Sequence, residues 1–192
     1  MQANDRPLYI FDLDGTLALI DHRRPLVEAP YIFVGDAANT HSIHDPNHPR
    51  KYKTIDGMVY QQDPNFKPDW SAFYDACHLD VPNMPVVRTF NQLYTIGAEL
   101  MIWSGREDSV QDKSIQWLSR VLNIHGHMLA QMLRMRPTGD YTPDEQLKRK
   151  WLNQLQPSQR QRLTAVFDDR DKVVKMWRGE GVTCFQVAPG EF

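Results

Sequence analysis

The feature that most constrains this chain is a repeated alternation between short apolar runs and longer amphipathic stretches. Five apolar runs have the length of strands and cover residues 8–11, 98–103, 128–133, 163–167 and 182–187. Amphipathic stretches of helical length cover residues 85–96, 109–122, 143–155 and 171–179. This order predicts an α/β fold, a three-layer α/β/α sandwich in which helices cover both faces of about five parallel strands.

The alternation stops between the first apolar run and the second. Residues 22–82 are rich in polar and turn-forming side chains, including Gly35, Pro46 and Gly57. We therefore predict a core domain of residues 1–21 and 83–192, interrupted after its first strand by a small cap insertion of residues 22–82.

One stretch of this insertion, residues 68–78, has the periodicity of a helix. Trp70, Phe73, Tyr74 and Cys77 recur there at helical spacing. Apolar residues at this period usually pack inward, so a core-facing stripe is favoured over a surface that stacks on a substrate.

Composition narrows the class of protein. With 192 residues and 41% hydrophobic side chains, the chain suits one domain, and its net charge of -2 gives no global attraction to nucleic acid or membrane. Only two cysteines, Cys77 and Cys184, and no apolar run of membrane-spanning length indicate a cytoplasmic protein, in the host cytoplasm if a phage encodes it. His41, His44 and His48 suggest zinc, but without a Cys partner or a predicted helix a polar loop is favoured.

Four carboxylates follow two of the predicted strands. Asp12 and Asp14 come directly after the first apolar run, and Asp168 and Asp169 follow the fourth. Ligands of open parallel sheets bind beyond the carboxyl ends of the strands, so these side chains are expected to meet at one sheet edge. Because four negative charges repel one another, a hard divalent cation with oxygen ligands, best Mg²⁺, is predicted there. Helix N-capping is the alternative for Asp168 and Asp169 taken alone.

Other polar residues complete a candidate phosphate site. Ser104, Gly105 and Arg106 follow the second apolar run and offer a hydroxyl, a backbone N–H and a guanidinium that can grip phosphate oxygens in two places. An ordinary strand-to-helix turn is the alternative. Lys148, in the basic segment of residues 148–150, is a candidate inward-pointing charge, although such a run is more often a solvated face.

These residues carry a resemblance to a known superfamily. Asp12-Leu-Asp-Gly-Thr resembles the first motif of the haloacid dehalogenase-like (HAD) phosphatases, Ser104 the second, Lys148 the third and Asp168-Asp169 the fourth, in the same order. A closer resemblance is to the 3′-phosphatase domain of phage polynucleotide kinase/phosphatases. It is carried by Ser104-Gly-Arg-Glu, the spaced set Arg136, Asp140, Asp144 and Lys148, and the C-terminal end from residues 168–178 through 185–192. The Gly-x-x-x-x-Gly-Lys-[Ser/Thr] motif does not occur, so we expect no kinase domain in this chain.

The resemblance implies a two-step mechanism. Asp12 would attack phosphorus as a nucleophile and form an aspartyl-phosphate. Asp14 would protonate the leaving oxygen and later deprotonate the water that opens the intermediate. Ser104 and Lys148 would hold the phosphoryl oxygens.

The same resemblance implies the remaining ligands. Magnesium would be held by the Asp12 carboxylate, the Asp14 backbone carbonyl and Asp168, with Asp169 orienting metal-bound water. The substrate would be bound by five residues, of which Arg23 is chosen by position alone: Thr16, Gly105, Arg106, Arg23 and Arg136.

Three functions remain open at this level. The leading hypothesis is a phosphatase that removes 3′-phosphate from polynucleotide ends, and its rival is a nucleotidase for free nucleoside monophosphates. An enlarged cap closing over the site would favour small substrates, whereas an open groove would admit a strand end. The third is a non-catalytic protein that binds nucleic-acid ends. The sequence leaves DNA against RNA, and the oligomeric state, undecided.

Overall fold

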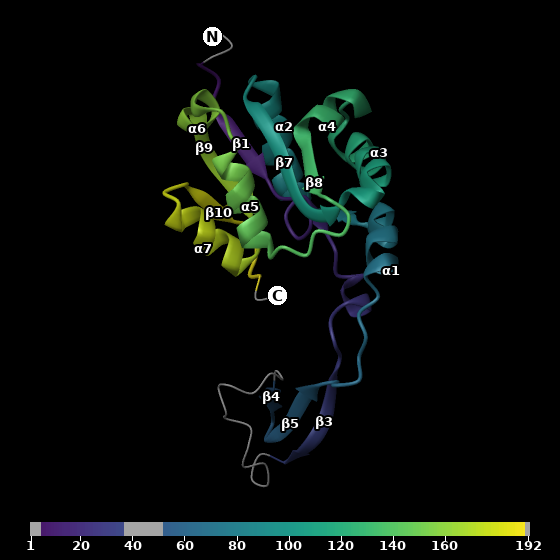
Figure 1. Cartoon of the computed structure of the whole chain (residues 1–192). Helices are drawn as coiled ribbons and strands as arrows, with labels where there is room; N and C mark the ends of the chain where they lie inside the picture. The colour runs from purple at the N-terminus through teal and green to yellow at the C-terminus, as the bar shows by residue number, and fades with distance from the viewer. Residues whose placement is uncertain (1–4, 37–51, 191–192) are drawn as a thin grey trace. The chain divides into compact units, whose positions relative to one another are not determined.

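A computed structural model describes residues 5–36 and 52–190 of the chain (Figure 1). Its main sheet has five strands in the order β10-β9-β1-β7-β8. Every pair of neighbouring strands in this sheet runs parallel. The central strand is the first in the sequence, so its two neighbours come from far along the chain. The bounds of the strands are β1 Leu8–Phe11, β7 Glu99–Glu107, β8 Leu133–Arg136, β9 Leu163–Asp168 and β10 Cys184–Gln186.

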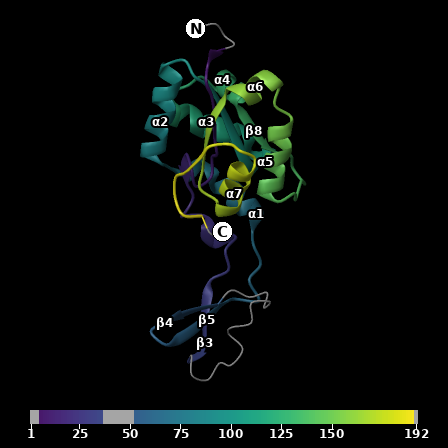
Figure 2. The same cartoon turned by 90° about the vertical axis from the view of Figure 1, so that its left-hand side faces the viewer.

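Helices cover both faces of this sheet, as Figure 2 shows, and the predicted α/β class is confirmed. Successive strand residues point to opposite faces, so Phe11 packs with the first group of helices and Ile10 with the second. None of the helices in the described part of the chain is both long and apolar enough to cross a membrane. The first group is α2 (Met84–Thr95), α3 (Gln111–Leu122) and α4 (Gly126–Met132), the second is α5 (Asp144–Asn153) and α7 (Asp171–Gly179), and α6 (Pro157–Arg162) precedes β9.

The strand predicted at residues 128–133 is wrong. Most of this run is helix α4, and the strand β8 begins only at Leu133. The apolar residues Met128, Leu129 and Met132 fit one face of a helix as well as a buried strand, and Leu129 packs into the core from α4. In β8 the true alternation follows, with Leu133 and Met135 buried.

The described chain divides into two compact units, of which the smaller is Asp21–Phe73. Residues 74–82, which the sequence analysis assigned to the insertion, group with the larger unit. The physical reason is their burial: Cys77 and Asp80 are inside it, and the indole of Trp117 donates a hydrogen bond of 2.8 Å to the Asp80 carbonyl. That the smaller unit acts as a cap stays a prediction.

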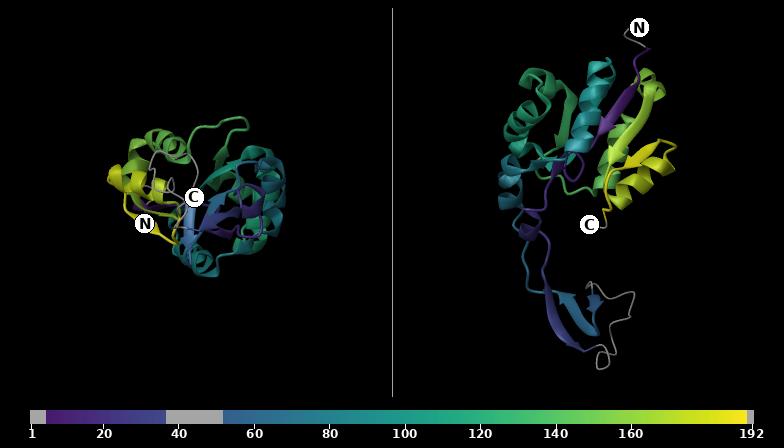
Figure 3. Two further views of the ribbon diagram at one scale, coloured as in Figure 1. Left: turned by 90° about the horizontal axis from the view of Figure 1, so that it is seen from below. Right: turned by 180° about the vertical axis from the view of Figure 1, so that it is seen from behind.

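The smaller unit contains an antiparallel sheet that the sequence analysis did not predict. Its strands β3 (Tyr31–Asp36), β4 (Tyr52–Ile55) and β5 (Met58–Gln62) pair in the order β3-β5-β4 (Figure 3). Asp56 and Gly57 form the two-residue turn between β4 and β5, and both have positive φ, 50° and 76°, the conformation of the tightest hairpins. Short elements complete the chain: β2 (Ala18–Leu19), β6 (Val81–Pro82), α1 (Trp70–Asp75), and 3-10 helices at Arg24–Leu26, Ala76–Leu79 and Asp108–Val110.

Candidate active site

The loop after β1 is locked against the end of β9. The backbone amide of Asp12 donates to the Phe167 carbonyl at 2.9 Å. Gly15 has a φ of +85°, and a Cβ at this position would lie 2.1 Å from an Asp169 carboxylate oxygen. Only glycine combines this backbone conformation with so close an approach. Thr16 then donates its hydroxyl to Asp169 at 3.2 Å, so the predicted substrate residue Thr16 contacts a carboxylate here.

Three of the four predicted carboxylates form one buried cluster. Ligand oxygens of Asp12, Asp168 and Asp169 lie within 4.8 Å of one another, and each residue is at most 4% exposed. Asp12 follows β1, Asp168 ends β9, and Asp169 is the next residue, so neighbouring parallel strands bring them together at their carboxyl ends.

Lys148 supplies a positive charge to this cluster. Helix α5 turns Leu147, Lys148 and Trp151 toward the core, whereas Arg149 and Lys150 are exposed, which splits the basic run between two faces. The Lys148 ammonium donates to Asp12 at 2.6 Å and to Asp168 at 2.8 Å. Burial lowers the pKa of Lys148, but the attraction of the two carboxylates raises it by more. The pKa of Lys148 therefore lies above its ordinary value.

The cluster carries more negative than positive charge. Burial raises the pKa of Asp12 well above its ordinary value, against the opposing effect of Lys148. Burial and the neighbouring Asp168 raise the pKa of Asp169 to about 6. Hard oxygen donors this close together suit a small divalent cation, whose charge would favour their ionised forms. The donor set therefore fits Mg²⁺, with Asp12, Asp168 and Asp169 as the residues able to hold it.

Asp14 lies outside this cluster and pairs with Arg106. A register shift in β7 between Ser104 and Glu107 marks the point from which Arg106 reaches across to the loop after β1. The buried guanidinium binds both carboxylate oxygens of Asp14, through Nε at 3.3 Å and more closely through a terminal nitrogen. It also donates to Asp80 at 2.8 Å. In this structure Arg106, predicted to bind substrate, holds Asp14.

Asp80 is the partner that sequence reasoning missed. Its side chain is fully buried and faces the same guanidinium as Asp14. Arg106 also donates to the hydroxyl of Ser114 at 3.0 Å, so three residues fix its position. No sequence signal marks Asp80, because it belongs to none of the motifs and lies in a stretch without clear periodicity.

The carboxyl end of β7, from Ser104 onward, is fixed by a second network. Ser104 is buried and its hydroxyl accepts the Arg106 amide at 3.1 Å. Arg136 donates to the Gly105 carbonyl at 2.8 Å and to Asp144 at 2.7 Å. A Cβ on Gly105 would lie 2.2 Å from the same Asp144 oxygen, so glycine lets the end of β7 approach the start of α5. Arg136 thus fixes the end of β7 in this structure.

Asp144 connects Arg136 to Arg170, which follows β9. Its second oxygen accepts Arg170 at 2.7 Å. Burial opposes its ionisation, but Lys148, Arg170 and Arg136 hold the pKa of Asp144 below its ordinary value. The Asp144 carboxylate therefore links the start of α5, the helix that carries Lys148, to Arg136 of β8 and to Arg170 after β9.

Arg23 belongs to the smaller unit and contacts Phe73 of the same unit. The residue is buried, its guanidinium lies 4.2 Å from the centroid of the Phe73 ring, and it donates to the Phe73 carbonyl at 3.4 Å. The predicted apolar stripe is inward-facing at Phe73 and Cys77, but Trp70 is 52% exposed. The other candidates in this region, His41, His44 and His48, lie outside the described residues.

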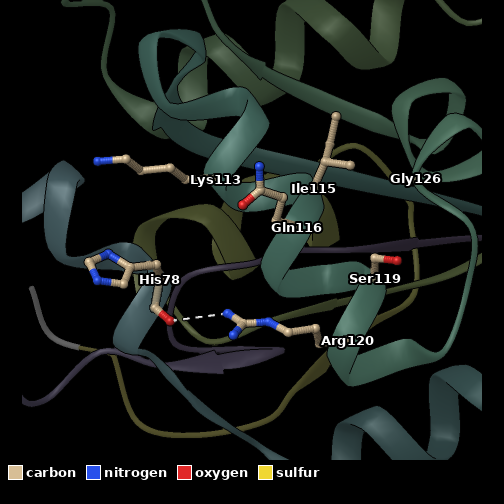
Figure 4. Close-up of a pocket in the computed structure, with 7 residues that line it drawn as sticks. All are labelled: His78, Lys113, Ile115, Gln116, Ser119, Arg120 and Gly126. Carbon is tan, nitrogen blue, oxygen red and sulfur yellow. Dashed lines mark hydrogen bonds between the residues drawn. The ribbon is translucent and has the colours of Figure 1, made fainter.

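A cavity of about 750 Å³ in the larger unit lies elsewhere, between α3 and the 3-10 helix Ala76–Leu79 (Figure 4). Lys113 and Arg120 of α3 and His78 line it, and Arg120 donates to the His78 carbonyl at 3.5 Å. None of its lining residues belongs to the carboxylate cluster. The candidate site is therefore defined by its buried charges and not by the volume of a cavity.

Comparison with known proteins places this arrangement in a family. Residues 54–192 match the family model described as the polynucleotide kinase PNKP phosphatase domain. The chain belongs to the PNKP phosphatase domain family. The matched residues include Ser104, Lys148, Asp168 and Asp169 but begin after Asp12. The assignment of Asp12 to the PNKP phosphatase site therefore rests on its contact with Lys148 and its place beside Asp168.

Solved structures support the same fold. A chain in the structure of the Pnkp1/Rnl/Hen1 RNA repair complex superposes with a TM-score of 0.61 at 24% identity, over 100% of this chain and 46% of that one. A chain in a second structure of the Pnkp1/Rnl/Hen1 complex gives a TM-score of 0.59 at 25% identity, over 97% and 48% respectively. The present chain thus spans just under half the length of the two chains it matches.

Proposed function

We propose that the chain is a magnesium-dependent phosphatase that removes 3′-phosphate from polynucleotide ends through an aspartyl-phosphate on Asp12. The observation that carries this proposal is the Lys148 ammonium held between Asp12 and Asp168 in the buried cluster. A substrate phosphate is an anion, and it can approach the Asp12 carboxylate only where positive charge offsets their repulsion. Membership of the PNKP phosphatase family supports the same reaction.

Each residue then has a defined task. Asp12 attacks phosphorus in line with the leaving oxygen, while Lys148 and the Ser104 hydroxyl hold the phosphoryl oxygens. Asp14 gives a proton to the leaving oxygen and later takes one from the attacking water. Arg106 binds both carboxylate oxygens of Asp14 in this structure, which positions Asp14 in its ionised form. The proton-donating step therefore requires Asp14 to be protonated and one of these two hydrogen bonds to open.

Magnesium belongs to the proposal because the donor set fits it. Asp12, Asp168 and the Asp14 backbone carbonyl would hold the ion. Asp169 would orient the water bound to it. When bound, Mg²⁺ supplies positive charge that offsets the repulsion between the carboxylates and the substrate.

The proposal is tested by phosphate release from matched substrates with Mg²⁺. These are an oligonucleotide with a 3′-phosphate, the same strand with a 5′-phosphate, and the free 3′- and 5′-mononucleotides. RNA and DNA versions belong in the panel because the solved relatives come from an RNA repair complex. We expect the 3′-phosphorylated strand to have the highest kcat/KM.

Two variants accompany this panel. Asp12→Asn removes the nucleophile with little change of shape, so turnover is expected to vanish while the fold remains. Asp112→Asn, at an exposed position of α3, is the matched control and should keep full activity. A preference for mononucleotides would make the chain a nucleotidase, and near-normal turnover by Asp12→Asn would exclude the covalent mechanism.

A further inference from the structure

The small antiparallel sheet of the smaller unit carries an aromatic and cationic row on one face. Phe33 of β3 and Lys53 of β4 both pair with Tyr60 of β5, so all three side chains share a face of the sheet. Tyr31 lies two residues before Phe33 and therefore points to the same face. The rings of Phe33 and Tyr60 meet edge to face, with centroids 5.9 Å apart.

Lys53 is held among these rings. Its ammonium lies 4.1 Å from the centroid of the Tyr31 ring and 5.9 Å from that of Tyr60, so it reaches across the middle strand β5. A cation over aromatic faces is attracted by their π-electrons and stays beside them. A positive charge therefore lies among the rings of this aromatic surface.

This face is open to solvent in the described structure. Phe33 is 56% exposed, and Met58 and Ile55, on the same face, are 46% and 49% exposed. On the opposite face Val59 is fully buried. Large apolar side chains are costly to expose as a group, which makes such a patch a candidate contact surface.

We propose that this aromatic face, defined by Tyr31, Phe33, Lys53 and Tyr60, binds the single-stranded segment of the polynucleotide substrate. Exposed rings offer a surface on which bases of any sequence can stack, and Lys53 offers a charge to the phosphate that follows a base. The inference deepens the proposed function, on which it rests, because a strand has several bases that can stack along this face, whereas a mononucleotide has only one.

The test compares two variants of this face with a control from the opposite face of β3. Phe33→Leu/Tyr60→Leu removes the rings but keeps apolar volume, and Lys53→Met removes the charge. Ile32→Ala is the control, because Ile32 is 38% exposed and neighbours Phe33 on the other face. Each variant of the 192-residue chain is titrated, without Mg²⁺, into a fluorescent single-stranded oligonucleotide that lacks a terminal phosphate.

We expect the leucine double variant to weaken binding roughly tenfold, within the range that loss of base–aromatic stacking produces. Lys53→Met should make binding less dependent on salt concentration, because one phosphate contact is lost. The same leucine variant should raise KM for the 3′-phosphorylated strand and leave KM for the 3′-mononucleotide unchanged. Ile32→Ala should change none of these values.

Several results would overturn the inference. Unchanged binding by the leucine variant would show that the rings do not touch the strand. An equal rise in KM for strand and mononucleotide would indicate general damage, and a change in oligomeric state would show that a second copy covers the face. Binding of the phosphate-free strand needs no turnover, so an inactive wild-type protein would refute the proposed function and leave this test intact.

Discussion

Replacing Lys148 by methionine is expected to destabilise the protein without Mg²⁺ by about 3–5 kcal/mol, the usual cost of leaving a buried charge without its partner. Lys148 is 1% exposed and makes two charge-assisted hydrogen bonds, to Asp12 and Asp168. Methionine keeps most of the volume, so the loss reports charge and not packing. The assay is urea unfolding in EDTA at pH 8, with Lys150→Met, an exposed position of the same helix, as control.

The pH dependence of this loss gives a second readout. Without Lys148 the pKa of Asp12 rises further, since its burial remains and its cationic partner is gone. A carboxyl whose folded-state pKa is raised stabilises the fold at low pH, and this contribution is lost as pH rises through that pKa. The cost of Lys148→Met should therefore be smaller at pH 5 than at pH 8. A loss below about 1 kcal/mol at pH 8, or one equal to that of Lys150→Met, would refute the reasoning.

Two further predictions concern the same site. Gly15→Ala places a Cβ 2.1 Å from Asp169, so it should abolish phosphate release, whereas Gly139→Ala, with a similar φ of +81° and open space, should cost only about 1–2 kcal/mol and keep activity. Equal behaviour of the two variants in unfolding and activity assays would contradict this. Because the pKa of Asp169 is raised from 3.8 to about 6, the metal-free protein should lose up to about 3 kcal/mol as pH rises through this window. Unfolding at several pH values should show that Asp169→Asn or saturating Mg²⁺ removes that slope, and a slope unchanged by both would exclude Asp169 as its source.

The main sheet was predictable because its signals are local. Strand β1 is a short apolar run followed directly by Asp12, and β9 is one that ends at Asp168. The rule that ligands bind at the carboxyl ends of parallel strands then brings Asp12 next to Asp168 from the sequence alone. The run at residues 128–133 failed because its apolar residues suit a helix and a strand equally. The hairpin of β4 and β5 was missed although Asp56-Gly57 is a strong turn signal, since apolar side chains lie on both faces of these short strands and the usual polar–apolar alternation is absent.

The contacts inside the site were less predictable. Arg106 was expected to face phosphate, because a guanidinium at a strand end has that chemistry. Its binding to Asp14 and Asp80 depends on the register shift in β7 and on a buried residue outside every motif. Likewise, the choice of Lys148 over Lys150 as the inward charge follows from the helix phase, which Leu147 and Trp151 set only once α5 packs on the sheet.

The central place of β1 has a consequence for how the protein is made. Leu8 pairs with Glu99 on one side and with Leu163 on the other, so both neighbours of this strand are synthesised long after it. A nascent chain carries β1 unpaired until β7 leaves the ribosome, and one edge of β1 stays open until β9 follows. Such long-range pairing slows folding. Asp12 and Asp168 meet only when β9 follows, so activity arises late in synthesis, and chains that terminate before β9 expose an edge that invites aggregation.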